Sequence, residues 1–278
     1  MRRHKPLAIL AWIIVVVVFF APWRFLRSPR HLCPGVTATE TSDRGRPFTV
    51  VRVDLQQASI NLYWNSSNGQ PFRTFSQLKS ELNRSQLDLA FAANAGIFAP
   101  GLTPLGLHVE NGHELVPINL SSGAGNFYLK PNGIFMVDSK GARIIKSNDY
   151  QGTSSKIRLA TQSGPLLVID GQINPVFRAD STNLQIRSGV GVVSSDQVDF
   201  VLSDEPVTFH RFARFFRDRL QCRQALYLDG AISRFYPFDS PANSVKSDFA
   251  GILAISANGR RLPRGKSPGA PATSANSK

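Results

Sequence analysis

The segment L-D-L-A-F-A-A-N-A-G-I-F, residues 87–98, contains the most informative structural pattern in the sequence. Residues 87–94 form an apolar run with the length and composition of a buried strand, and a glycine follows at position 96. Glycine has no Cβ atom, so its backbone can bend sharply or approach another group closely. The stretch therefore predicts a buried strand that ends in one polar side chain, Asn94, followed by a tight bend.

Three other segments repeat this order of an apolar strand, small residues and one polar side chain. They are A-T-Q-S-G-P-L-L-V (160–168), I-R-S-G-V-G-V (186–192) and A-L-Y-L-D-G-A-I-S-R-F (225–235). A polar residue at the end of a buried strand is held rigidly, which suits a site. We expect the polar members to share one cleft: Asn94, Ser163, Arg187 and Asp229. The alternative for each residue taken alone is a side chain that stabilises a turn.

The remainder of the globular region predicts strands with few helices. Helical spacing of apolar residues covers Thr74–Asn83 and Val207–Gln221. The predicted strands are residues 48–54 and 59–64 (as a hairpin), 105–110, 114–118, 134–137, 157–160, 165–169, 189–193, 198–202, 225–228 and 252–255. Because strands and helices do not alternate regularly, we expect a single α+β domain with mixed or antiparallel sheets.

The N-terminus predicts a transmembrane or signal helix in residues 1–23. Basic residues at positions 2, 3 and 5 precede an apolar run from Leu7 to Pro22. Phe19, Phe20 and Pro22 make a poor cleavage site, which favours an uncleaved anchor over a cleaved signal. Residues 24–47 are rich in Pro, Arg, Ser and Thr and predict a linker, whereas residues 258–278 predict a disordered basic tail. The globular domain is then expected at residues 48–257.

The positive charge lies mostly outside this predicted domain. The net charge is +13, of which residues 1–47 carry +6 and residues 258–278 carry +5, which leaves +2 for residues 48–257. A nucleic-acid groove needs clustered Lys and Arg side chains in the folded part of the protein. The distribution therefore argues against nucleic-acid binding and favours a role for the basic ends in membrane topology.

Cysteine and histidine usage excludes several kinds of site. Two cysteines, Cys33 and Cys222, cannot build a disulfide framework or a structural zinc site. We favour a flexible Cys33 and a buried Cys222 that packs as a small hydrophobe, with a single Cys33–Cys222 disulfide as the alternative. His108 is isolated in its segment and is expected to be structural. The sequence contains no nucleophile elbow, phosphate-binding loop or dinucleotide fingerprint.

Two of the candidate residues have side chains suited to catalysis on a phosphorylated substrate. Asp229 ends an apolar strand, where a carboxylate is costly to bury unless it is paired or used. It suits a metal ligand, a general acid or base, or a nucleophile. Arg187 suits bidentate binding of a phosphate, with a structural ion pair, for example to Asp229, as the alternative.

Taken together, the four segments resemble the phosphodiester glycosidase family. The resemblance covers roughly residues 48–256 and is strongest to an uncharacterised bacterial branch that also contains L-K-P-N-G (129–133) and F-A-R-F-F-R-D-R-L-x-C (212–222). Family motifs of the form N-A-G and L-D-G-G-G-S match Asn94–Gly96 and Leu228–Ser233. This chain departs from the second motif, because Gly230 is followed by Ala231 and Ile232 instead of two further glycines.

The resemblance implies a hydrolase that cleaves a glycosyl-1-phosphate diester in a glycan or glycolipid of the cell envelope. It implies a catalytic set of Asp229, Arg187 and Asn94, and a substrate-binding set of Ser163, Gly164, Gly96, Gly230 and Ser233. A divalent metal ion is left open as a cofactor. With the N-terminal helix, the domain is expected at the inner membrane, facing the periplasm or the exterior, or else to be secreted. The alternative function is a non-catalytic envelope module that binds a glycan or a protein.

Overall fold

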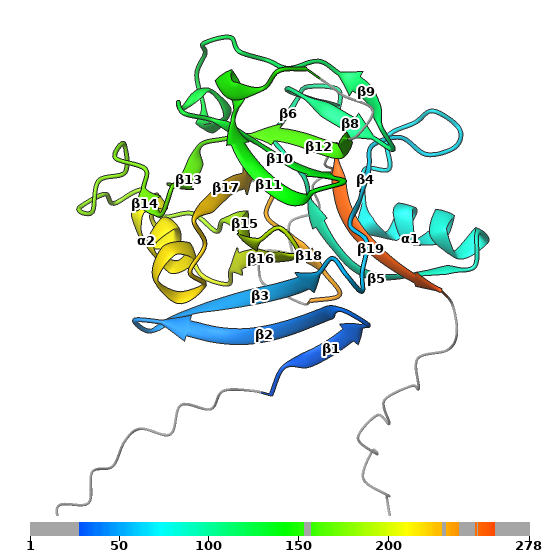
Figure 1. Cartoon of the computed structure of the whole chain (residues 1–278), viewed down its shortest axis with the longest axis horizontal. Helices are drawn as coiled ribbons and strands as arrows, with labels where there is room; N and C mark the ends of the chain where they lie inside the picture. The colour runs from blue at the N-terminus through cyan, green and yellow to red at the C-terminus, as the bar shows by residue number, and fades with distance from the viewer. Residues whose placement is uncertain (1–27, 153–156, 230–231, 239–247, 249, 259–278) are drawn as a thin grey trace, which may run out of the picture.

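The computed structural model describes residues 28–152, 157–229, 232–238, 248 and 250–258. These residues form three antiparallel sheets, a two-stranded ribbon and a few short helices (Figure 1). The predicted α+β class with antiparallel sheets is confirmed, in a form that is mostly β. The predicted helix of residues 1–23 and nearly all of the predicted tail lie outside the described residues. Within the described ranges, no helix is long and apolar enough to cross a bilayer.

The largest sheet has eight strands. Its order is β1 (Arg30–Cys33), β2 (Val36–Asp43), β3 (Arg46–Asp54), β16 (Gln197–Ser203), β15 (Ser188–Ser194), β17 (Gln224–Asp229), β13 (Leu166–Ile169) and β14 (Gln172–Ile173).

The other two sheets pack against it. The five-stranded sheet has the order β11 (Gly141–Lys146), β10 (Gly133–Asp138), β12 (Ile157–Ser163), β8 (His108–Glu110) and β9 (His113–Val116). The four-stranded sheet has the order β18 (Phe235–Tyr236), β5 (Leu87–Asn94), β19 (Ile252–Asn258) and β4 (Asn61–Tyr63). The ribbon pairs β6 (Phe98–Ala99) with β7 (Thr103–Pro104).

The predicted hairpin of residues 48–54 and 59–64 is wrong. Both segments contain strands, but β3 pairs with β2 and β16, whereas β4 pairs with β19 in another sheet. The intervening turn is short, yet the chain leaves one sheet and enters the next there. Local strand patterns therefore located the elements without giving their partners.

The predicted linker of residues 24–47 is also wrong from residue 30 onward. Strand β2 pairs with β3 along its whole length, from Val36 opposite Val53 to Asp43 opposite Arg46. β2 buries Val36 and Ala38, and many of its other residues are threonines, which favour strands without being strongly apolar. The folded domain therefore begins before residue 47.

The two cysteines are both buried and both free. Cys222 packs as a small hydrophobe, because a Cβ atom added at Gly191 would lie 2.6 Å from its sulfur. Cys33 lies in β1 and is not the flexible residue that was predicted. The preference for unpaired cysteines agrees with the structure.

Both predicted helices are present. Helix α1 (Phe75–Arg84) is capped by Thr74, whose Oγ1 accepts a hydrogen bond from the backbone N–H of Gln77 at 3.3 Å. Helix α2 (Phe209–Arg214) is capped in the same way by Thr208 and continues as a π-helical turn, Phe215–Arg219. Short 3-10 turns occur at Asn126–Tyr128 and Ser147–Asp149.

One aromatic contact joins the three sheets. Phe200 of β16 has its ring centroid 5.3 Å from that of Phe91 in β5 and 6.2 Å from that of Phe135 in β10. Phe91 also meets Phe235 of β18 edge to face, with centroids 5.3 Å apart. All four rings are at most 1% exposed. Such pairs add stability beyond the burial of their area, and their geometry fixes how the sheets pack.

Replacing Phe200 with alanine is expected to lower the free energy of unfolding by about 3–5 kcal/mol, because it leaves a cavity where three sheets meet. Leu184→Ala, at a side chain that is half exposed, should change it by less than about 0.5 kcal/mol. Urea unfolding followed by circular dichroism measures both. A loss below about 1 kcal/mol for Phe200→Ala would contradict the central role of this contact.

The carboxyl group of Asp204 is expected to make the free energy of unfolding depend on pH. Burial raises the pKa of its carboxyl to about 6, and the nearby Glu40 and Glu205 act in the same direction while Thr49 opposes them. The folded state therefore binds a proton more tightly than the unfolded state, so stability falls as pH rises from about 4 to about 6. Asp204→Asn should stabilise the protein at pH 7 by about 1–2 kcal/mol, a value reduced for partial exposure. The difference should vanish near pH 4 in unfolding curves, and an equal gain at both pH values would refute this explanation.

Candidate active site at the strand ends

The ends of β5, β15 and β17 meet at Asn94, Ser188 and Asp229. The Asn94 Nδ2 atom donates to Ser188 Oγ at 3.5 Å, and Ser188 Oγ donates to the backbone carbonyl of Asp229 at 3.2 Å. The Asn94 Oδ1 atom accepts from the backbone N–H of Arg234 at 3.0 Å. Asn94 is 2% exposed and Ser188 is fully buried, so both side chains are held by the fold.

Two further hydroxyls complete this cluster. Ser233 Oγ donates to the backbone carbonyl of Asp229 at 2.6 Å, and Ser163 Oγ donates to the carbonyl of Leu228 at 2.9 Å. Hydroxyl groups of three serines from different segments therefore donate to the last two backbone carbonyls of β17. Asp229 itself is buried, with 8% of its surface exposed. The structure brings the predicted residues Asn94, Ser163, Asp229 and Ser233 together.

The sequence prediction missed Ser188. It follows Arg187 directly in the I-R-S-G segment, and only the larger side chain was chosen there. Successive residues of a strand point to opposite faces, so a single segment offers one polar side chain to each side. This alternation was the one signal for Ser188: if Arg187 points to one face of the strand, Ser188 points to the other.

Arg187 lies on the other side of this strand from Ser188. Its Nε atom donates to the carbonyl of Val207 at 2.9 Å, and its Nη2 atom donates to Asn183. Its guanidinium carbon lies 3.6 Å from the ring centroid of Phe209 and 5.6 Å from that of Tyr227. Arg187 is 1% exposed, and burial lowers its pKa. Its side chain is therefore engaged with the α2 region of the protein, and its role in phosphate binding stays a prediction.

Two of the predicted substrate-binding glycines are explained by close packing. A Cβ atom at Gly96 would lie 2.3 Å from the carbonyl oxygen of Gln162. One at Gly164 would lie 2.5 Å from Asn132 Cβ and 2.9 Å from the carbonyl oxygen of Phe127. Both contacts are with backbone or rigid atoms, so a larger residue would separate the strand ends. Gly230 lies outside the described residues.

Comparisons with known proteins agree with the predicted family. The family model described as Phosphodiester glycosidase matches residues 88–248, a segment that contains every residue of the cluster. The chain belongs to the phosphodiester glycosidase family. The family resemblance seen in the sequence is confirmed, and membership supports a hydrolase.

Two proteins illustrate the relationship. The chain is 38% identical over 184 residues, 66% of this chain and 72% of the relative, to the uncharacterized protein YigE of Escherichia coli (strain K12). Its fold matches the catalytic domain of zebrafish N-acetylglucosamine-1-phosphodiester alpha-N-acetylglucosaminidase, auto-inhibited by its pro-peptide, with a TM-score of 0.54. That match has 13% identity and covers 80% of this chain and 82% of the zebrafish domain.

A second solved structure has the same fold. A hypothetical protein from Synechocystis matches with a TM-score of 0.51 and 14% identity, over 80% of this chain and 62% of that protein. At such identities the two structures establish the fold of this phosphodiester glycosidase and leave its substrate open.

His108 lies close to the cluster in this phosphodiester glycosidase. Its Nε2 atom is 2.7 Å from Glu110 Oε1, and the ring meets Trp64 edge to face at 5.9 Å. A Cβ atom added at Gly251 would lie 3.3 Å from His108 Cε1, and the carbonyl of Gly251 accepts from the backbone N–H of Ala95 at 2.8 Å. These contacts agree with the structural role predicted for His108, which supports the backbone immediately after Asn94.

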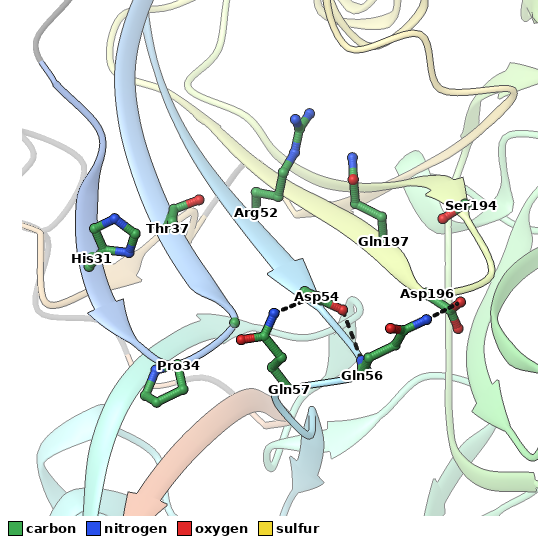
Figure 2. Close-up of a pocket in the computed structure, with 11 residues that line it drawn as sticks. His31, Pro34, Thr37, Arg52, Asp54, Gln56, Gln57, Ser194, Asp196 and Gln197 are labelled. Atoms are coloured by element: carbon green, nitrogen blue, oxygen red, sulfur yellow. Dashed lines mark hydrogen bonds between the residues drawn. The ribbon is translucent and has the colours of Figure 1, made fainter.

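A separate polar groove lies on the largest sheet, away from the cluster. It has a volume of about 600 Å³ and is lined by side chains of β2, β3 and the β15–β16 turn (Figure 2). Its carboxylates are held by neighbouring glutamines: Asp54 accepts from the Gln57 side chain at 2.6 Å, and Asp196 accepts from the Gln56 side chain at 3.1 Å (Figure 2). The groove contains none of the predicted site residues.

Metal binding stays open as a prediction. Among the described residues, no group of three or more His, Cys, Asp or Glu side chains is arranged to hold a metal ion. Asp229 belongs to the cluster through its backbone carbonyl, which accepts from the hydroxyls of Ser188 and Ser233. Any divalent ion there would depend on substrate oxygens for much of its coordination.

Arg187→Lys is expected to lower the free energy of unfolding by about 2–4 kcal/mol, because lysine cannot reproduce the planar fork to Val207 and Asn183 or the stacking on Phe209. Arg178→Lys, at an exposed ion pair with Asp180, should change stability by less than about 0.5 kcal/mol. Denaturant unfolding compares the two variants. Unchanged stability in Arg187→Lys would show that the buried contacts contribute little and would favour a substrate role.

Proposed function

We propose that this phosphodiester glycosidase hydrolyses the bond between the anomeric carbon of a sugar and a phosphodiester. The observation that carries the proposal is the hydrogen-bonded cluster of Asn94, Ser188, Asp229 and Ser233 inside the segment that matches the family. It presents one carboxylate and several fixed polar groups at the ends of buried strands. The sequence resemblance had implied the same chemistry.

The reaction needs stabilisation of positive charge on the sugar more than it needs a strong acid. Glycoside cleavage passes through an oxocarbenium-like transition state. The group that leaves is a phosphate monoester, which is a stable anion, so protonation of the leaving oxygen matters less than in cleavage of an ordinary glycoside. We assign Asp229 to the sugar side, where its carboxylate would act as a nucleophile or as the base that activates water.

Asn94 and the serines would position the substrate and the carboxylate. Asn94 Nδ2 has two N–H groups, and the bond to Ser188 uses one of them; no other described residue accepts from Nδ2, so the second would bind a sugar hydroxyl or a phosphate oxygen. Ser188 and Ser233 fix the backbone of Asp229, which limits the movement of its carboxylate. Groups held in this way lose little freedom in the transition state.

The N-terminal segment supports an envelope location within this proposal. Its basic start and apolar run are typical of a membrane anchor, with a secreted protein as the alternative. The substrate would then be a glycan or glycolipid phosphodiester outside the cytoplasm. The zebrafish enzyme, by its name, acts on N-acetylglucosamine 1-phosphodiesters, so N-acetylglucosamine is the first sugar to test.

A non-catalytic glycan- or protein-binding module is the second candidate. The departure Gly230-Ala231-Ile232 from the glycine-rich family motif favours it, because side chains at these positions restrict the backbone beside Asp229. Binding of a sugar phosphate without turnover would distinguish this candidate from the hydrolase.

Asp229→Asn is expected to reduce kcat/KM at least about 1,000-fold while leaving the fold intact, because the amide cannot act as a nucleophile or base. The measurement is release of N-acetylglucosamine from UDP-N-acetylglucosamine and from a p-nitrophenyl phosphodiester of N-acetylglucosamine, with the full chain in detergent, with and without Mg²⁺. Asp180→Asn, at an exposed carboxylate, is the matched control and should retain activity. Full activity in Asp229→Asn, or no turnover by the unaltered chain on either substrate, would count against the proposal.

A further inference from the structure

Arg234 provides a cationic group beside the cluster that the mechanism above does not use. Its backbone N–H donates to Asn94 Oδ1 at 3.0 Å. The pairing of β18 with β5 sets Phe235 opposite Ala93 and Tyr236 opposite Ala92. Continued by one residue, this register places Arg234 opposite Asn94. Directly opposed residues of an antiparallel pair point to the same face, so we expect the Arg234 side chain on the side of the sheet that carries the Asn94 amide.

The guanidinium of Arg234 has buried nitrogen atoms that lack partners. In the part of the chain that the structure describes, Nε and Nη2 are both inaccessible to solvent and make no hydrogen bond. Burial lowers the pKa of Arg234, and the field of Asp248 offsets this only in part. The Asp248 carboxylate already accepts hydrogen bonds from Nε, at 2.9 Å, and Nη2 of Arg73. Arg234 is half-buried as a residue, but its Nε and Nη2 donors are buried and unused, which is costly unless they bind an anion in the working state.

Arg187 and Arg234 differ in the hydrogen bonding of the guanidinium edge that is formed by Nε and Nη2. In Arg187, Nε and Nη2 are bonded to Val207 and Asn183. In Arg234, Nε and Nη2 are the two atoms without partners. These two N–H groups form the planar edge that grips two oxygens of a phosphate or carboxylate at once. Arg234 therefore offers the bidentate geometry that Arg187 has already used.

We propose that Arg234 binds the phosphate of the substrate through its Nε–Nη2 edge and thereby selects glycosyl phosphates over neutral glycosides. The inference rests on the proposed function and names the group that recognises the leaving side of its substrate. Asn94 would then lie between the phosphate and the sugar, because its Oδ1 holds the Arg234 backbone and its Nδ2 faces Ser188. Arg187 would contribute to the stability of the fold and not to this contact.

A neighbouring cation supplies a matched control. Lys79 donates to the hydroxyl of Tyr236 at 2.9 Å and lies 5.3 Å from the centroid of that ring. Tyr236 is two residues from Arg234 and so points to the same face. If general positive charge attracted the substrate, removing the charge of Lys79 would weaken binding about as much as removing that of Arg234.

The test is isothermal titration calorimetry of the full chain with N-acetylglucosamine 1-phosphate, with N-acetylglucosamine and with inorganic phosphate. Arg234→Gln should weaken binding of the sugar phosphate by about 10-fold to 100-fold and leave binding of the neutral sugar unchanged. The affinity of Arg234→Lys for the sugar phosphate should lie between those of the unaltered chain and Arg234→Gln, because lysine keeps the charge but lacks the two parallel N–H groups. Lys79→Gln should change the affinity less than about 2-fold. Thermal melting checks that each variant is folded. If Arg234→Gln does not fold, the comparison is made with Arg234→Lys instead.

The results separate this inference from the proposed hydrolysis. Equal affinity of Arg234→Gln and the unaltered chain for the sugar phosphate overturns the inference, as does failure of the unaltered chain to bind it. An equal loss in Lys79→Gln overturns the bidentate contact in favour of diffuse charge. Arg234-dependent binding without any turnover supports the inference while refuting the hydrolase.

Discussion

The contact of Phe200 with Phe91 and Phe135 holds the three sheets together. Each ring comes from a different sheet, so their packing fixes the relative positions of all three sheets. Asn94 lies three residues beyond Phe91 on the same strand, and its position is therefore set by the core. Asn94, Ser163, Ser188 and Asp229 each lie at the end of a strand that the core holds in place, which fixes their backbone positions.

The sequence predicted most strands and both α-helices, because these depend on local pattern. It also predicted one cleft for Asn94, Ser163, Arg187 and Asp229, and the structure brings Asn94, Ser163 and Asp229 together without Arg187. Strand β5 is apolar throughout, and α1 shows helical spacing behind a threonine cap. What it could not give was the partner and the face of each strand. The sequence of β2 resembles a linker because it contains several threonines and few strongly apolar residues, although β2 pairs with β3 along its whole length.

Arg187 shows the same limit at the candidate site. The segment I-R-S-G contains two polar residues, and only the register of β15 decides which of them faces Asn94. A bulge in the pairing of β15 with β17 sets Ser188 opposite Asp229 and Gly189 opposite Tyr227. A bulge of one residue changes which side chains share a face, and the amino-acid pattern does not reveal it. Sequence alone does not single out Arg234 either, because the burial of its Nε and Nη2 atoms without hydrogen-bond partners is visible only in the structure.

The place of β19 in the four-stranded sheet has a consequence for how this sheet assembles. β19 is formed by residues 252–258, late in the chain, yet it lies between β5 and β4, which are formed by residues 87–94 and 61–63. Until residues 252–258 are available to pair, β5 and β4 therefore each have an unpaired edge. The four-stranded sheet, and with it the pairing on both sides of Asn94, is complete only when β19 joins β5 and β4.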